Sequence, residues 1–128
     1  MKALLADTHA LIWFARLDPR LSERALAAIQ DGENLVFASV ASVWEIGLKV
    51  ARGKLDLGTP PEQFVRGLLA QQIRILPIQL RHTFRAAALP PHHGDPFDRM
   101  LVGQALEDGL TLVTCDGQLK AYGVPILW

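Results

Sequence analysis

The sequence contains a single cysteine and no long uninterrupted hydrophobic run. Cys115 has no second cysteine to pair with, so an internal disulfide is excluded, and there is no Cys/His spacing typical of a structural zinc site. Near the N-terminus, Asp7 and His9 interrupt the apolar stretch too early for a signal-peptide core or a membrane span. These absences predict a reduced, cytoplasmic protein with no membrane association, in which Cys115 is a core residue.

Net charge is also absent, because 13 basic residues balance 13 acidic ones. The charges are segregated, however, since residues 49–85 contain seven Lys or Arg and two Asp or Glu, a local excess of five. This basic middle segment suits contact with a phosphate backbone and solvated helix faces equally well. Half of the 128 residues are hydrophobic, which predicts one folded domain over residues 1–128.

Apolar strands alternate with helical patterns along the chain. Pro77 indicates an edge position for the third strand, because proline cannot donate to the sheet. In the helix after the second strand, an apolar stripe that includes Val40, Val43, Trp44 and Leu48 is expected to face the core. The alternation predicts an α/β/α sandwich around a mostly parallel sheet of about five strands. We expect strands at residues 2–6, 35–38, 74–78, 110–114 and 124–127. We expect helices at 9–16, 22–32, 41–52, 59–72 and 95–108, and a short helix that follows the third strand and includes residue 84.

Four acidic residues belong to elements that meet at one edge of the predicted sheet. Asp7 and Asp116 come directly after the first and fourth strands, and Glu45 lies near the start of the helix that leaves the second strand. Asp98 lies in the first turn of a helix that runs antiparallel to the strands, so its N-terminus reaches the same carboxyl edge. Clustered carboxylates repel one another unless a cation lies between them, and their oxygens suit Mg²⁺ or Mn²⁺ better than zinc. The pattern indicates metal-assisted phosphodiester hydrolysis.

Each of the four acids also has an ordinary structural role available, as a helix cap, an ion-pair partner or a turn residue. From spacing alone, the metal site and these structural roles are equally well supported. The alternatives are an N-cap for Asp7, a capping box with Ser42 and an ion pair with Lys49 for Glu45, a first-turn charge behind a cap at Asp95 for Asp98, and a turn start for Asp116.

Four stretches occur in a fixed order: residues 4–13 (LLADTHALIW), 39–49 (SVASVWEIGLK) with 53–55 (GKL), 93–101 (HGDPFDRML) and 112–116 (LVTCD). In this order they resemble the PIN domains, and within them the VapC-type toxins of bacterial toxin–antitoxin pairs. The resemblance covers nearly the whole chain. It implies a PIN-like α/β/α sandwich, a homodimer, and a cognate antitoxin whose segment covers the active-site groove. It further implies an active site that binds Mg²⁺ or Mn²⁺ and cleaves single-stranded RNA. Its acidic residues would be Asp7, Glu45, Asp98 and Asp116.

The same resemblance adds supporting positions around the acids. Thr8 and Thr114 match hydroxyl positions often near the metal, and Asp95 and Arg99 belong to the DPFDR stretch. The chain departs from the family at Cys115, where relatives often carry arginine or another polar residue, which puts an RNA contact by that side chain in doubt.

Aromatic and histidine side chains near these stretches have less specific interpretations. His92 and His93 adjoin the acidic helix, where contact with RNA or action as a base is possible but no catalytic role is the favoured interpretation. Trp13 and Trp44 lie at helical spacing with apolar residues, which favours packing in the core or a dimer interface over base stacking.

Two other functions fit part of the pattern. A phosphatase that uses Asp7 as its nucleophile typically has a second aspartate two residues on, where this chain has His9, and no GxxxxGK[ST] or GxGxxG motif is present. A non-catalytic RNA-binding module would use the basic middle segment while the acids only cap helices. The function predicted from the sequence is a metal-dependent endoribonuclease, the toxin of a toxin–antitoxin pair that inhibits translation or growth, with RNA as its substrate.

Overall fold

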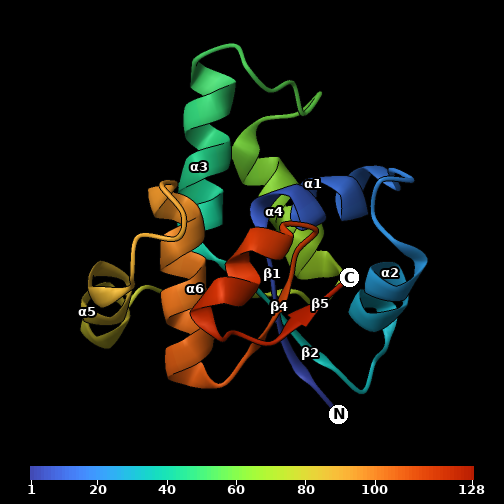
Figure 1. Cartoon of the computed structure of the whole chain (residues 1–128). Coiled ribbons are helices and arrows are strands. Elements are labelled where there is room, and N and C mark those ends of the chain that lie inside the picture. The colour runs from blue at the N-terminus through green and yellow to red at the C-terminus, as the bar shows by residue number, and fades with distance from the viewer.

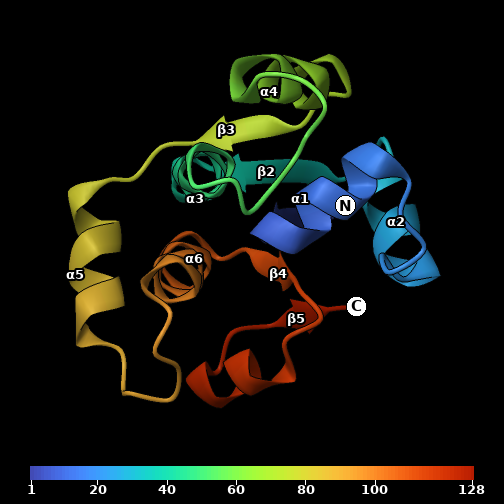
Figure 2. The same ribbon diagram turned by 90° about the horizontal axis from the view of Figure 1, so that it is seen from above.

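The computed structural model describes residues 1–128 as a five-stranded sheet with helices on both faces (Figures 1 and 2). Alternation of short apolar runs with amphipathic stretches produces this α/β order, as the sequence predicts. The strands are β1 (Ala3–Ala6), β2 (Leu35–Ser39), β3 (Arg74–Leu76), β4 (Thr111–Val113) and β5 (Ile126–Leu127). The helices are α1 (Thr8–Arg16), α2 (Glu23–Gln30), α3 (Val40–Ala51), α4 (Pro61–Ala70), α5 (Leu80–Ala88), α6 (Pro96–Asp108) and the 3₁₀ helix η1 (Gly117–Tyr122).

The sheet has the strand order β3-β2-β1-β4-β5, and every neighbouring pair is parallel. β1 therefore lies at the centre, where Ala6 is level with Ala38 of β2 and Val113 of β4. β3 lies at the edge, as Pro77 indicates, and it ends before that proline. The predicted mostly parallel sheet of about five strands is thus confirmed.

Both faces of the sheet are buried, which explains why the strands are continuously apolar. Successive side chains of β1 point to opposite faces, so Leu4 packs into one core and Leu5 into the other. The Leu4 core is covered by α1, α2 and α4, whereas the Leu5 core is covered chiefly by α6. Seen from above, α1 and α2 lie on one side of the sheet and α5 and α6 on the other (Figure 2). None of the helices is long and apolar enough to cross a membrane.

Several local predictions are wrong in detail. Val40 and Trp44 of α3 are exposed, with 63% of Trp44 accessible, because the buried side of α3 is the one that carries Ser42 and Ile46. Cys115 is exposed rather than a core residue, since it follows β4 in the turn toward η1.

Two helix starts also differ from the prediction. Ser39, not Ser42, caps α3, because its Oγ accepts a hydrogen bond from the N–H of Ala41 at 3.0 Å. The helix expected at 59–72 begins at Pro61, with Pro60 in the cap position and no hydrogen bond from a capping side chain. The missing cap costs little at α4, because Pro61 at the first helical position has no backbone N–H that needs a partner.

The carboxyl ends of the strands gather the predicted site residues. Asp7 follows β1, and β2 runs directly into α3. α6 packs along the sheet in the opposite direction to the strands, so its first turn lies at the same upper edge in Figure 1. This edge is where ligands bind in open parallel sheets, because strand ends and helix N-termini converge there.

Candidate active site

Asp7 connects the central strand to the first helix and is almost completely buried. Its Oδ1 accepts a hydrogen bond from the N–H of Ala10 at 2.8 Å, which makes Asp7 the N-cap of α1. The Thr114 side chain, at the end of β4, forms a second hydrogen bond to the carboxylate. The predicted structural role of Asp7 is therefore real, and it fixes the carboxylate at the edge of the sheet.

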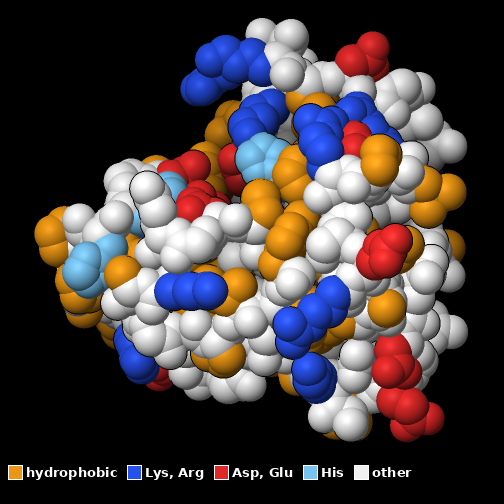
Figure 3. All heavy atoms as spheres, turned by 45° about the vertical axis from the view of Figure 1, so that its right-hand side comes forward, with side chains coloured by type: hydrophobic (Ala, Val, Ile, Leu, Met, Phe, Trp, Pro, Cys, Tyr) orange, Lys and Arg blue, Asp and Glu red, His pale blue; other side chains and the backbone are white.

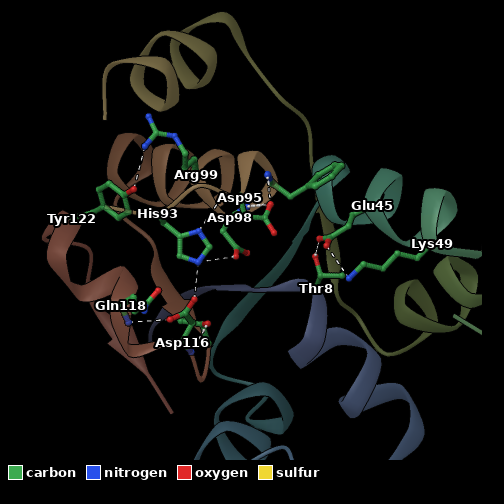
Figure 4. Close-up of polar contacts among 12 residues, drawn as sticks. Thr8, Glu45, Lys49, His93, Asp95, Asp98, Arg99, Asp116, Gln118 and Tyr122 are labelled. Carbon is green, nitrogen blue, oxygen red and sulfur yellow. Dashed lines mark hydrogen bonds and ion pairs between the residues drawn. The ribbon is translucent and has the colours of Figure 1, made fainter. Parts of the chain in front are cut away.

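Glu45 lies on the buried side of α3, where two partners hold its carboxylate (Figure 4). The Thr8 hydroxyl donates to Glu45 Oε1 at 2.6 Å, and Lys49 Nζ lies 3.1 Å from Oε2. The ion pair with Lys49 is the one predicted from their spacing of four residues. The predicted capping box with Ser42 is absent; Ser42 Oγ instead lies 3.0 Å from Thr8 Oγ1 and extends this buried polar group.

Asp98 lies in the first turn of α6, behind a cap that another acid supplies. Asp95 Oδ1 accepts hydrogen bonds from the N–H groups of Phe97 and Asp98, at 2.8 and 3.4 Å. Because Asp95 caps the helix, the Asp98 carboxylate is not needed for capping and turns toward the other acids. Asp95 is thus a supporting residue that orients the start of α6.

Asp116 lies in the turn after β4 and caps η1, with Oδ1 accepting from the N–H of Gln118 at 3.0 Å. Its other oxygen, Oδ2, lies 3.0 Å from His93 Nε2, and the same nitrogen lies 3.6 Å from Asp98 Oδ2. Ligand atoms of His93, Asp98 and Asp116 all lie within 4.8 Å of one another (Figure 4). Asp116 therefore lies with Asp98 at the shared edge.

The electrostatics of this group are those of crowded carboxylates. The pKa of Asp98 is raised to about 7, chiefly by burial and also by the negative charges of Asp95, Asp7 and Glu45, while His93 acts in the opposite direction. Burial also raises the pKa of Asp7, against the hydrogen bonds from Thr114 and Ala10. Carboxylates that hold protons this strongly gain from a divalent cation, which replaces the proton and compensates the repulsion. Carboxylate oxygens are hard ligands that suit divalent cations.

A hollow of about 420 Å³ adjoins the acids between α3 and the start of α6. Lys49 and Arg52 line it together with Glu45 and Asp95. On the face shown in Figure 3, acidic side chains gather close to a group of Lys and Arg side chains. This juxtaposition provides cationic groups beside a site that is itself negative, and such groups can contact an anionic ligand.

Not every predicted site residue joins this group. Arg99 points away from the acids and donates to the carbonyl oxygens of Ala86, Leu89 and Pro90, so it ties the end of α5 to α6 (Figure 4). His92 packs against the Tyr122 ring rather than at the site, with ring centroids 5.1 Å apart. Arg99 is thus a scaffold residue.

Two contributions to the site were not predicted. His93 contacts two of the acids, although a loop histidine gives no helical or strand periodicity from which this contact could be inferred. Ser42 also reaches the site, and the i, i+3 spacing from Ser42 to Glu45, which places both on one face of α3, is a signal that could have found it.

A parallel sheet with acids clustered at its carboxyl edge is an arrangement that could hold a metal ion. Comparison with known proteins identifies the family. The PIN domain model matches residues 4–125, so the chain belongs to the PIN domain family. Within that family it is 31% identical over 126 residues to Ribonuclease VapC22 of Mycobacterium tuberculosis, which covers 98% of this chain and 95% of the relative.

Solved structures agree on the fold. VapBC2 from Rickettsia felis, bound to a promoter DNA fragment, matches 98% of this chain and 97% of its own with a TM-score of 0.72 at 16% identity. FitAcB from Neisseria gonorrhoeae matches 98% of this chain and 96% of its own with a TM-score of 0.64 at 25% identity. The predicted PIN-like fold and the predicted VapC-type membership are confirmed.

Proposed function

We propose that this chain is a divalent-metal-dependent endoribonuclease and the toxin of a toxin–antitoxin pair. Membership of the PIN domain family and the likeness to a named VapC ribonuclease support this activity. The observation that carries it in the structure is the convergence of acids at one sheet edge. Ligand atoms of Asp98 and Asp116 lie within 4.8 Å of each other beside His93, and burial together with the nearby charges of Asp95, Asp7 and Glu45 raises the pKa of Asp98 to about 7. Acids that serve only as helix caps have no reason to be brought together in this way.

In this proposal Asp7, Asp98 and Asp116 hold Mg²⁺ or Mn²⁺, and Glu45 completes the site. When bound, the ion lowers the pKa of a water molecule and stabilises charge on the phosphate. The Thr8 hydroxyl and Lys49 Nζ hold the two oxygens of the Glu45 carboxylate and so fix its orientation. Lys49 and Arg52 in the adjoining hollow are placed to neutralise phosphates of the bound RNA.

Replacement of Asp98 tests this function. We expect Asp98→Asn to lower metal-dependent RNA cleavage by about 100-fold or more, because the amide loses the charge that binds the ion. Cleavage is measured on RNA with Mg²⁺ or Mn²⁺, and circular dichroism checks the fold of the variant. The control is Glu33→Gln, which neutralises an exposed acid at the other end of the sheet and is expected to keep full activity.

Equal cleavage by Asp98→Asn and the unaltered protein would contradict the nuclease proposal. RNA binding that is unaffected by metal, together with higher stability after neutralisation of the acids, would instead support a non-catalytic RNA-binding module. These results separate the two functions because only a nuclease requires the ion for turnover.

The proposal includes two protein partners. VapBC and FitAcB structures are among those that the chain resembles, and this supports a cognate antitoxin that is encoded nearby and binds the toxin. We further propose a homodimer, for which the exposed apolar side chains Trp44 and Val40 of α3 and Phe84 of α5 provide contact surface. Light scattering of the protein alone and after coexpression with the product of the adjacent gene measures both associations.

A further inference from the structure

His93 connects the two parts of the acidic site that come from distant elements. Its Nε2 lies 3.0 Å from Asp116 Oδ2 and 3.6 Å from Asp98 Oδ2 (Figure 4). At these distances the imidazole could act as a nitrogen ligand of the metal or as a hydrogen-bond donor to the carboxylates. The two roles need opposite protonation of Nε2, because a ring nitrogen that carries a hydrogen has no lone pair for a metal.

The other ring nitrogen decides between these roles. The backbone N–H of Asp95 donates to His93 Nδ1 at 3.1 Å. A backbone amide can only donate, so Nδ1 must keep its lone pair and the neutral ring carries its hydrogen on Nε2. Nε2–H then points at the two carboxylates as a donor. Action as a metal ligand or as a proton acceptor through Nε2 would require Nδ1 to carry the hydrogen and lose the bond to Asp95.

We propose that His93 is a positioning residue for the acidic site, which acts through an Nε2–H donor to Asp116 and does not ligate the metal. The inference rests on the proposed metal-dependent function. Asp116 lies in a half-exposed turn, where Gln118 holds one oxygen and His93 the other. A carboxylate oxygen has two lone pairs, so Asp116 Oδ2 can accept from His93 and still bind a cation.

The same contact fixes two elements relative to each other. His93 lies two residues before Asp95, which caps α6 and so sets the position of Asp98. Through His93, the start of α6 is bonded to the turn between β4 and η1 that carries Asp116. Removal of the imidazole leaves the Asp116 carboxylate with only the hydrogen bond from the backbone N–H of Gln118. A freer carboxylate binds the ion less tightly because binding must then order it.

Mn²⁺ binding to the purified protein, measured by electron paramagnetic resonance of the free ion, tests this role without reference to activity. We expect His93→Ala to weaken Mn²⁺ binding by about 10-fold, the usual effect of removing a group that orients a ligand. His93→Gln places an amide N–H where Nε2–H was and should restore most of the affinity. The control is His92→Ala, which removes the neighbouring histidine that packs against Tyr122 and should leave Mn²⁺ binding unchanged.

Long-range ¹H–¹⁵N NMR spectra of the imidazole provide a second measurement, at a pH of about 8, above the ordinary histidine pKa. We expect the Nε2–H form of His93 both without metal and with Mg²⁺ bound. The Nδ1–H form, or loss of the Nε2 hydrogen when Mg²⁺ binds, would overturn the proposal.

The binding measurements also separate this inference from the function on which it rests. Unchanged Mn²⁺ affinity in His93→Ala overturns the positioning role and leaves the metal site intact. A loss of Ni²⁺ or Zn²⁺ binding in both His93 variants that greatly exceeds the loss of Mn²⁺ binding identifies a nitrogen ligand and overturns it as well. Failure of the unaltered protein to bind Mn²⁺ or Mg²⁺ overturns the proposed function itself.

Discussion

Individual carboxylates at this site use their two oxygens for different purposes. In Asp7 and Asp116, Oδ1 accepts a hydrogen bond from a backbone N–H at the start of a helix. The second oxygen of Asp116 is directed toward His93 and the other acids. A structural cap and a site ligand are therefore compatible roles for one residue, and the cap holds the carboxylate in the orientation that the site needs.

The pKa of Asp98 predicts how the stability of the metal-free protein depends on pH. Its value of about 7 in the folded protein, against 3.8 for an ordinary aspartate, means that the folded state binds more protons than the unfolded chain within this window. The free energy of unfolding should therefore fall as the pH rises from about 4 to about 7. The hydrogen bonds from Arg20 lower the pKa of Asp18 to about 2, so the contribution of Asp18 to stability is constant across this window and is lost only as the pH falls below it.

Urea unfolding in the presence of a chelator measures this dependence. Asp98→Asn should show a shallower fall with pH than the unaltered protein, because the variant lacks the titrating group. Asp7, whose pKa is also raised, retains part of the slope in that variant. Stability that increases over this range in the unaltered protein would show that the acids are not crowded as the structure has them.

At the scale of elements, the site depends on how closely α6 packs against its neighbours. α5 lies against α6 (Figure 2), and the two are joined by ion pairs from Arg81 to Asp108 and from Arg85 to Glu107. Gly103 permits this approach, because a Cβ at that position would lie 2.9 Å from the backbone nitrogen of Ala86. Arg81 and Arg85 belong to the basic middle segment. Part of the charge of that segment is therefore engaged in ion pairs between helices.

Replacement of this glycine tests the packing. We expect Gly103→Ala to destabilise the protein by about 1–3 kcal/mol, since the methyl group forces backbone apart. The matched control is Gly67→Ala on the exposed side of α4, where nothing lies within 4 Å and alanine should stabilise the helix by about 0.5–1 kcal/mol. Chemical unfolding measures both variants. A Gly103→Ala protein as stable as the control would mean that α5 and α6 pack less closely.

At the scale of the whole molecule, one sheet edge collects negative charge from four separate parts of the chain. The metal-free fold carries the repulsion among these acids, and a bound cation relieves it. Ligands that bind only the folded state raise its stability by mass action. The folded state as a whole should therefore respond to divalent ions even though they touch a few residues only.

Metal addition tests this coupling. At a Mn²⁺ concentration of about 100 times the dissociation constant, the free energy of unfolding should increase by about 2.7 kcal/mol. A chelator should reverse the effect, and Asp98→Asn should show little of it at the same concentration. Thermal unfolding with and without Mn²⁺ provides the measurement. An equal increase in Asp98→Asn would place the stabilising ion elsewhere on the molecule.

The sequence by itself determined the elements and the places of the acids among them. Apolar runs and helix signals act over a few residues, so they predicted the strands, the edge position of β3 and the cap at Asp7. The rule that parallel strands share a carboxyl edge then placed Asp7 and Asp116 together. The ion pair from Glu45 to Lys49 followed in the same way, from spacing along one helix.

Only the tertiary structure decided which side chains face one another, because those contacts depend on packing between residues far apart in the chain. Periodicity could not show that Trp44 is exposed while Ser42 is buried, since both belong to a helix with apolar residues on several sides. Nor could it show that Arg99 binds backbone carbonyls instead of the site. The contact of His93 with Asp116 spans 23 residues and arises only when α6 packs on the sheet beside β4.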